Sequence, residues 1–198
     1  MWGKKNSIKV PIEISARHCH LAAGDLVKLF GAGYELKKMR QLYQPSDFAC
    51  QETVDIQFGP PNGGKEIEMV RVVGPLREQT QVEISLTDAV GSGIVPPVRL
   101  SGNLQGSSRV ILKGPAGHVE LNEGLIISQR HIHCATDEAK KYNLKNGDLV
   151  SVKIDEGREV IFGKIIVRVR ADYKLCLHLD TDEGNAAGIN KTGEGQII

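Results

Sequence analysis

The sequence predicts a mainly β protein composed of two related β-barrel domains with short capping α-helices. Many short runs rich in valine and isoleucine alternate with turn residues, and the 198 residues include 22 glycines and 8 prolines. Short strands at such spacing favour barrels over an open α/β sheet. An internal repeat further indicates that the barrel occurs twice in the chain.

The repeat is centred on two histidine-x-histidine (HxH) motifs, each preceded by an arginine. Residues 14–21, with the sequence ISARHCHL, match residues 127–134, with the sequence ISQRHIHC, at five of the eight positions. A single HxH motif is common by accident, whereas two copies in matching context favour a shared chemical purpose. The repeat therefore indicates both the domain organisation and the position of a functional site.

Each motif is followed by a sheet-like region that ends in an acidic segment of small residues. These segments are residues 82–89 in the first half and 177–183 in the second. We therefore predict one domain over residues 1–100 and a second over 101–198, with the boundary within about residues 100–122.

The elements around the two motifs are expected to be alike. A strand at residues 8–14 leads into the first motif, and a helix at 24–30 follows it, with Gly31 as a stop signal. A strand at 125–128 leads into the second motif, and a helix at 136–142 follows it. Further strands are predicted at residues 52–58, 65–73, 79–86, 109–112, 149–154, 160–169 and 175–179, and tight turns at 60–64, 146–148 and 155–157.

Composition limits the classes of function. The formal net charge is +1, from 25 lysines and arginines against 24 acidic residues, so no charge-driven attraction to nucleic acid or to a membrane surface is expected. No apolar run approaches the ~20 residues of a membrane span, and the start of the chain lacks the apolar stretch of a signal peptide. We therefore expect a cytoplasmic protein without nucleic-acid or membrane partners.

Three of the four cysteines, Cys19, Cys134 and Cys176, are expected to pack in the core. All four are scattered, and none forms a CxxC pair, so neither a disulfide framework nor a thiolate zinc site is predicted. No Ser-His-Asp or Cys-His arrangement suggests a covalent nucleophile. The four cysteines are Cys19, Cys50, Cys134 and Cys176.

The HxH motifs predict metal binding. On a strand, residues i and i+2 point to the same face, so each motif presents two imidazoles to one ion. A stable zinc site needs a third protein ligand, and a catalytic one keeps a position open for water or substrate. The two acidic segments supply Glu83 and His178 as candidates. The predicted triads are His18, His20 and Glu83 in the first half, and His131, His133 and His178 in the second.

The remaining histidine and two arginines are interpreted separately. His118, beside a glycine-rich turn, is expected to be a solvent-exposed loop residue. Arg77 lies six residues before Glu83, so a strand could place both in one site. Arg168 lies in an otherwise apolar strand, where it could equally be a buried ion-pair member or an anion clamp. Two metals with two arginines would suit an anion such as phosphate.

The residues together resemble the PduL-type phosphate acyltransferases, also called phosphate propanoyltransferases. The resemblance spans about residues 8–190 and rests on both HxH motifs together with GPLREQTQVE at 74–83, PVRLSG at 97–102 and DEGNAA at 182–187. The segment CAT after the second motif replaces the usual Met-Ser-Pro, and Gly184 stands where alanine is commoner. Neither difference removes a candidate ligand.

The resemblance implies a dizinc active site between two β-barrels, with the two triads as zinc ligands. It implies reversible transfer of a short acyl group, propanoyl or acetyl, between coenzyme A and inorganic phosphate. Our hypothesis for the mechanism is direct displacement without an acyl-enzyme. Arg77 and Arg168 would handle phosphate, Gln81 and Ser101 would line the site, and Gln44 is a candidate for contact with coenzyme A. The zinc of the first triad would bind the CoA sulfur and the other zinc would orient phosphate.

The resemblance also bears on assembly and location. A homodimer is plausible for the family. Relatives directed to bacterial microcompartments carry an amphipathic N-terminal extension, whereas only residues 1–7 precede the first predicted strand here. We therefore expect a cytoplasmic enzyme, with the microcompartment lumen as the alternative location.

Two other functions remain open on the residues alone. A dinuclear metal hydrolase of a thioester or phosphate ester would use similar ligands to activate water. A β-barrel binding module with purely structural metals would instead need closed, four-ligand sites, whereas each predicted triad offers three ligands.

Overall fold

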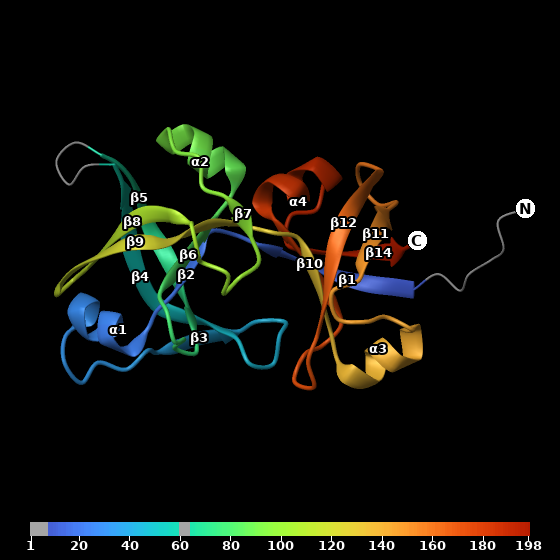
Figure 1. Ribbon diagram of the computed structural model, residues 1–198, viewed down its shortest axis with the longest axis horizontal. Coiled ribbons are helices and arrows are strands. Elements are labelled where there is room, and N and C mark those ends of the chain that lie inside the picture. Colours follow the sequence, from blue (N-terminus) through green and yellow to red (C-terminus); the bar gives the residue numbers. More distant parts are fainter. Residues whose placement is uncertain (1–7, 60–63) are drawn as a thin grey trace, which may run out of the picture. The chain divides into compact units, whose positions relative to one another are not determined.

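The computed structural model describes residues 8–59 and 64–198, and within them the protein is mainly β, as predicted (Figure 1). Most of the turn expected at residues 60–64 lies outside the described residues. The four helices in this part of the chain are seven or eight residues long, and none is long and apolar enough to cross a membrane.

Fourteen strands and four helices are found in the described residues. The strands are β1 (Ile8–Ser15), β2 (His18–His20), β3 (Lys38–Gln41), β4 (Phe48–Phe58), β5 (Lys65–Gly74), β6 (Gln81–Ile84), β7 (Val98–Arg99), β8 (Ser108–Gly114), β9 (Gly117–Ser128), β10 (His131–Cys134), β11 (Leu149–Ile154), β12 (Val160–Val169), β13 (Cys176–Asp180) and β14 (Thr192–Ile197). The helices are α1 (Ala23–Phe30), α2 (Leu86–Ser92), α3 (Thr136–Tyr142) and α4 (Thr181–Ala187).

The first compact unit, which we call the first-motif barrel, contains Ala16–Leu42 and Ser46–Ser128. Its strands pair in the order β4, β5, β2, β6, β9 and β8, and the ring closes because β8 pairs with both β9 and β4. Strands β3 and β7 extend the ring by pairing with β4 and β9. Fully buried aliphatic side chains such as Val72, Val82 and Leu125 fill its interior.

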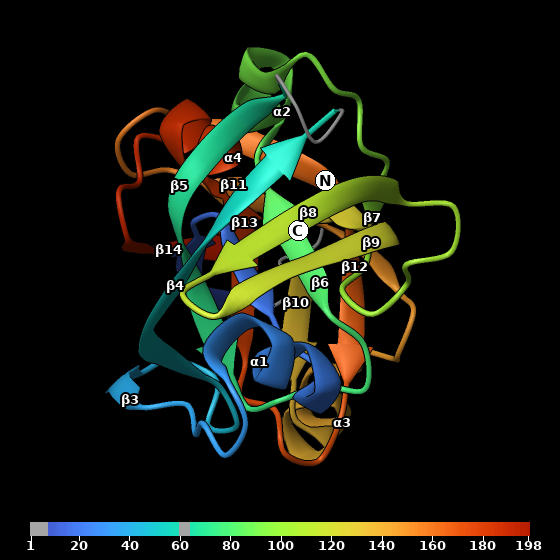
Figure 2. The ribbon, with the colours of Figure 1, turned by 90° about the vertical axis from the view of Figure 1, so that its left-hand side faces the viewer.

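Helix α1 packs against the β8–β9 hairpin of this barrel, as Figure 2 shows. The amide of Ala116 at the hairpin tip donates a hydrogen bond to the Leu29 carbonyl, 2.9 Å away. A Cβ atom at Gly114 would lie 2.4 Å from the same carbonyl oxygen. Glycine is therefore required at this position, because any side chain would push the helix off the hairpin.

The second compact unit, the second-motif barrel, contains β1, Tyr43–Pro45 and Gln129–Ile198. Its six strands close in the order β1, β13, β10, β12, β11 and β14. Ile12 of β1 and Ile132, Ile165 and Leu177 lie in its core. The prediction of two related β-barrels with short helices is confirmed.

The two barrels have the same order of strands around the ring, and each includes the strand that directly precedes the motif of the other barrel. Strand β1, which precedes the first motif, pairs with β13 and β14. Strand β9, which precedes the second motif, pairs with β6 and β8. The strand before each motif therefore completes the barrel of the other motif, and we call β1 and β9 the exchanged strands.

This exchange changes the expected domain boundary. The compact units do not divide at residues 100–122, because β8 and β9 remain in the first-motif barrel up to Ser128, and β1 lies in the second-motif barrel. Both barrels need a strand at the same place in the ring, so the hydrophobic pattern of β1 and β9 could not indicate which barrel each would join.

The strand expected at residues 79–86 is shorter than predicted. β6 ends at Ile84, and Ser85 then caps α2, with its hydroxyl accepting a hydrogen bond from the amide of Asp88 at 3.1 Å. Asp180 caps α4 in the same way through the amide of Glu183, at 2.8 Å. Both helices were absent from the sequence prediction, although a capping residue followed three positions later by an acidic residue is a helix-start signature.

The strand exchange predicts where a core truncation acts. Ile12→Ala removes a side chain that is 2% exposed in the second-motif barrel, and Leu125→Ala removes one that is 0% exposed in the first-motif barrel. Each should cost about 2–5 kcal/mol of local stability. In hydrogen exchange, Ile12→Ala should reduce amide protection in β10–β14 and Leu125→Ala in β2–β8. Loss of protection in β2–β6 after Ile12→Ala, or in β10–β13 after Leu125→Ala, would contradict the exchange.

Candidate metal centres

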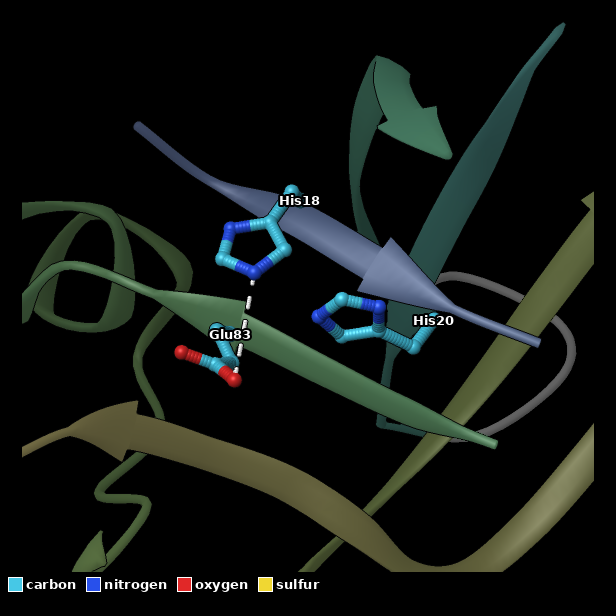
Figure 3. A group of neighbouring side chains, drawn as sticks. All are labelled: His18, His20 and Glu83. Atoms are coloured by element: carbon cyan, nitrogen blue, oxygen red, sulfur yellow. Dashed lines mark ion pairs between the residues drawn. The ribbon is translucent and has the colours of Figure 1, made fainter. Parts of the chain in front are cut away.

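The first triad is assembled by one antiparallel strand pair. In the pairing of β2 with β6, His18 lies opposite Glu83 and His20 lies opposite Gln81. The two imidazoles and the Glu83 carboxylate point toward one another (Figure 3). Their candidate ligand atoms lie within 4.8 Å of one another, and His18 Nε2 is 3.8 Å from Glu83 Oε1. The structure thus brings together the three residues predicted as the first triad.

Hydrogen bonds orient both imidazoles of this triad. His18 Nδ1 lies 2.9 Å from the Ala16 carbonyl oxygen, and His20 Nδ1 lies 2.9 Å from the Val73 carbonyl oxygen. A carbonyl can only accept, so both rings carry the proton on Nδ1 and present the Nε2 lone pair. This is the tautomer and the type of supporting bond that metal-binding histidines use.

The protonation of the triad suits a cation. Burial lowers the pKa of His20 well below its ordinary value, and the nearby His18 and Arg77 side chains lower it further, so the ring is neutral near pH 7. Burial acts to raise the pKa of Glu83, but His18, His20 and hydrogen bonds with Ser128 and Ser101 outweigh it and bring that pKa to about 2. Two neutral imidazoles and one carboxylate form a donor set that zinc commonly takes in catalytic sites.

A hydrogen-bond network links this triad to Arg77. The Gln81 amide donates to Glu83 Oε1 at 2.6 Å and to the Ser101 hydroxyl oxygen at 2.7 Å. Arg77 Nη1 donates to the same hydroxyl oxygen at 2.8 Å, and the Gly102 amide fixes Gln81 Oε1 at 2.9 Å. The structure therefore places three predicted site residues, Arg77, Gln81 and Ser101, in one network beside the first triad.

The second triad repeats the strand geometry of the first. In the antiparallel pairing of β10 with β13, His131 lies opposite His178, as His18 lies opposite Glu83 in the other barrel. The ring centroids of His133 and His178 are 4.8 Å apart, and those of His131 and His133 are 4.6 Å apart. Glu83 and His178 therefore occupy the same position in the strand pairing of their barrels, as the repeat suggested.

In this triad, a hydrogen bond orients His131 through Nδ1, and a carboxylate lies near Nδ1 of His178. His131 Nδ1 lies 2.8 Å from the Gln129 carbonyl oxygen, which repeats the bond between His18 and Ala16. His178 Nδ1 lies 3.6 Å from the Glu13 carboxylate. A carboxylate behind a metal-binding imidazole is a common supporting arrangement.

His133 has no hydrogen-bond partner for either ring nitrogen among the described residues, although the ring is only 8% exposed. Burial lowers the pKa of His133 far below its ordinary value, and His131, His178 and Arg168 lower it further, so the ring is neutral. A buried nitrogen without a partner is costly. A metal ion would satisfy it, so this donor set also suits zinc. Among the described residues, however, only the first triad has its candidate ligand atoms within 4.8 Å of one another.

Gln44 lies beside the second triad. Its Nε2 donates to the Lys174 carbonyl at 2.9 Å, its Oε1 accepts from the Lys174 amide at 3.1 Å, and its Nε2 is 3.4 Å from His178 Nε2. The side chain is 2% exposed and is held by these contacts. The geometry makes Gln44 a neighbour of His178, and its predicted contact with coenzyme A stays a prediction.

Arg168 lies next to the second triad on the parallel strand β12, at the register position of His133. The side chain is only partly buried, and within residues 8–59 and 64–198 no carboxylate forms an ion pair with it. Of the two interpretations left open by the sequence, the buried ion pair is not found. Each triad thus has one arginine close to it, Arg77 in the first-motif barrel and Arg168 in the second.

Three side chains near the triads were missed by sequence reasoning. Glu13 and Ser128 lie on the exchanged strands, and they contact His178 and Glu83, respectively. Tyr173 stacks on His133 with 4.0 Å between ring centroids. No local motif indicates these residues, because strand pairing across the two sequence halves brings the first two to the triads.

Two further side-chain predictions can be compared with the structure. His118 is exposed, as expected, but it lies in strand β9 and not in a loop. All four cysteines are free and buried. Burial raises the pKa of Cys50 and Cys134 to about 11, so both thiols are protonated near pH 7.

The buried cysteines predict an unreactive native protein. At pH 8, an aromatic disulfide reagent should modify none of the four thiols in the folded chain within minutes, because it needs an exposed thiolate. All four should react after unfolding in guanidinium. Rapid modification of a native thiol, with loss of enzyme activity, would indicate a cysteine nucleophile instead.

Comparisons with known proteins agree over most of the chain. A family model described as phosphate propanoyltransferase matches residues 11–190. A phosphate propanoyltransferase of Thermotoga maritima is 47% identical over 184 residues, which are 92% of this chain and 85% of that protein. Enzymes of the same name from Lachnoclostridium phytofermentans and Priestia megaterium are 44% and 46% identical, over 98% of this chain and 88% and 87% of their own lengths.

Proposed function

The chain belongs to the phosphate propanoyltransferase family, and we propose that it transfers a short acyl group, propanoyl or acetyl, reversibly between coenzyme A and inorganic phosphate. The observation that carries the proposal is the duplicated triad with an arginine beside each copy. Such a constellation suits two anionic groups, the phosphate and the thiolate that leaves, and the names of the relatives include phosphate and a propanoyl group.

The proposed reaction is a direct displacement. An oxygen of phosphate attacks the carbonyl carbon of the thioester, and the carbonyl π electrons move to its oxygen. When they return, the carbon–sulfur bond breaks and its electron pair leaves with sulfur, giving acyl phosphate and the thiolate of coenzyme A. The proton of monohydrogen phosphate is released to solvent or to that sulfur. No covalent intermediate with the protein is required, in agreement with four buried, free cysteines.

Zinc is the metal that the two donor sets suit best, with His18, His20 and Glu83 holding one ion and His131, His133 and His178 the other. When bound, zinc supplies a Lewis acid, which we assign to the thiolate in the first triad and to phosphate in the second.

The arginines and their hydrogen-bonded neighbours do the positioning. Arg77 is held by the Ser101 hydroxyl, which Gln81 also contacts, so its guanidinium is oriented before substrate arrives. Fixed positive charge of this kind stabilises an oxyanion without reorganisation at the moment of reaction. Arg168, without an ion-pair partner in the described part of the chain, supplies a second charge for phosphate.

Phosphate dependence tests the reaction type. We expect thiol release from propanoyl-CoA to require added phosphate and to yield acyl phosphate, detectable as a hydroxamate after reaction with hydroxylamine. The control is the same assay without phosphate in a non-nucleophilic buffer. Thiol release at the same rate without phosphate would favour the metal-dependent hydrolase, and absence of turnover with zinc-loaded protein would favour a binding module.

Arg77 tests the proposed charge stabilisation. Arg77→Ala should lower kcat/KM for phosphate by about 10²- to 10³-fold, the typical cost of removing one oxyanion donor. Arg109→Ala is the matched control, because Arg109 forms an exposed ion pair with Glu120 on the β8–β9 hairpin, and its activity should be unchanged. Near-normal activity in Arg77→Ala would remove this residue from the mechanism.

A further inference from the structure

The arginine that precedes each HxH motif forms an ion pair at the same place in the repeat. Arg17 Nη1 lies 2.5 Å from Asp88 Oδ1, and Arg130 Nε lies 3.3 Å from Glu183 Oε1. The acidic partners are largely covered, with 16% and 19% of their side chains exposed. Neither arginine is among the residues assigned above to metal or substrate.

Both acidic partners occupy the same position in a helix cap. Asp88 is the third residue of α2, and its side chain accepts a hydrogen bond from the amide of the capping residue Ser85 at 3.4 Å. Glu183 does the same for Asp180 at the start of α4, at 3.1 Å. The capping residues follow Glu83 and His178 by two positions. Each ion pair therefore ties an HxH motif to the helix that directly follows the third ligand of its triad.

In the sequence, each arginine also lies between the two residues that are joined by the hydrogen bond that sets a histidine tautomer. His18 Nδ1 bonds to the carbonyl of Ala16, and His131 Nδ1 bonds to the carbonyl of Gln129. In both cases the arginine is the single residue between the carbonyl and the imidazole. A side chain anchored at that residue restrains the peptide that orients the ring.

We infer that Arg17 and Arg130 are positioning residues for the two metal centres, each holding a ligand histidine in register with the third ligand through its ion pair with Asp88 or Glu183. The inference rests on the proposed metal function. It gives the arginine of each RHxH motif a purpose distinct from contact with substrate.

A role in general stability accounts less well for these contacts. A partly exposed ion pair typically contributes about 0–1 kcal/mol to folding. The same pair recurs at the same two positions of the repeat, with different acids, whereas the exposed pair between Arg109 and Glu120 joins β8 to β9 and involves neither HxH motif. Arg130 has one further contact, with its guanidinium 5.3 Å from the Phe162 ring centre, which would retain part of its position without Glu183.

The test measures the rate at which zinc-loaded protein loses zinc to a chelator. Arg17→Gln should speed loss from the first triad by about tenfold, and Arg130→Gln should do so at the second, the lower end of the usual effect of supporting residues. His20→Ala and His133→Ala, each lacking one site, assign the two phases of wild-type zinc release. Arg109→Gln is the control and should not change either phase.

The measurement is made at pH 8, with thermal unfolding of the metal-free protein alongside it. Burial raises the pKa of Glu183 to about 7, so this higher pH ensures that the partner of Arg130 is ionised. Arg17→Lys, and the exchanged pair Arg17→Asp with Asp88→Arg, should restore slow zinc loss at least in part. These variants keep the test valid where Arg17→Gln is poorly folded.

The outcomes separate the inference from the function on which it rests. Wild-type zinc binding with unchanged release from Arg17→Gln and Arg130→Gln would overturn the positioning role and leave the metal centres intact. A lower unfolding temperature with unchanged zinc release would also overturn it, because the pairs would then be merely structural. Wild-type protein that binds no zinc would overturn the proposed metal centres themselves.

Discussion

In each barrel, a histidine lies directly opposite the third ligand on the neighbouring antiparallel strand, so that His18 faces Glu83 and His131 faces His178. Because side chains alternate between the two faces of a strand, a slip of one residue in either pairing would turn the ligand to the opposite face. The positions of both triads depend on this register. Two features lie where they would oppose such a slip. The helix caps Ser85 and Asp180 follow the third ligands by two positions, and the ion pairs of Arg17 and Arg130 join each motif to the capped helix.

The exchanged strands explain why the two sequence halves need each other. Ser128 on β9 supports Glu83, and Glu13 on β1 supports His178, so each third ligand is contacted by a side chain from the opposite half. The triads differ in charge, since one includes a carboxylate and the other only imidazoles. A metal ion in the all-histidine triad would keep more of its positive charge and would attract an anion more strongly, which agrees with assigning phosphate to it.

The sequence was sufficient to predict the β-barrel pair and the grouping of His18, His20 and Glu83, because strand periodicity orients each HxH motif and the repeat aligns Glu83 with His178. Metal binding at either triad stays a prediction. The sequence also placed Arg77, Gln81 and Ser101 near the first triad, through the family resemblance. The residues it missed, such as Glu13 and Ser128, reach the triads only through strand exchange, which no local pattern encodes. The domain boundary at residues 100–122 failed to match the compact units for the same reason.

The central claim is that each triad holds its own metal ion, and counting zinc per chain tests it most directly. Purified wild-type protein should contain two zinc ions per chain, and the double variants His18→Ala with His20→Ala and His131→Ala with His133→Ala should each retain one. Wild-type protein with zero or one zinc ion after reconstitution, or a double variant that keeps both ions, would contradict the account.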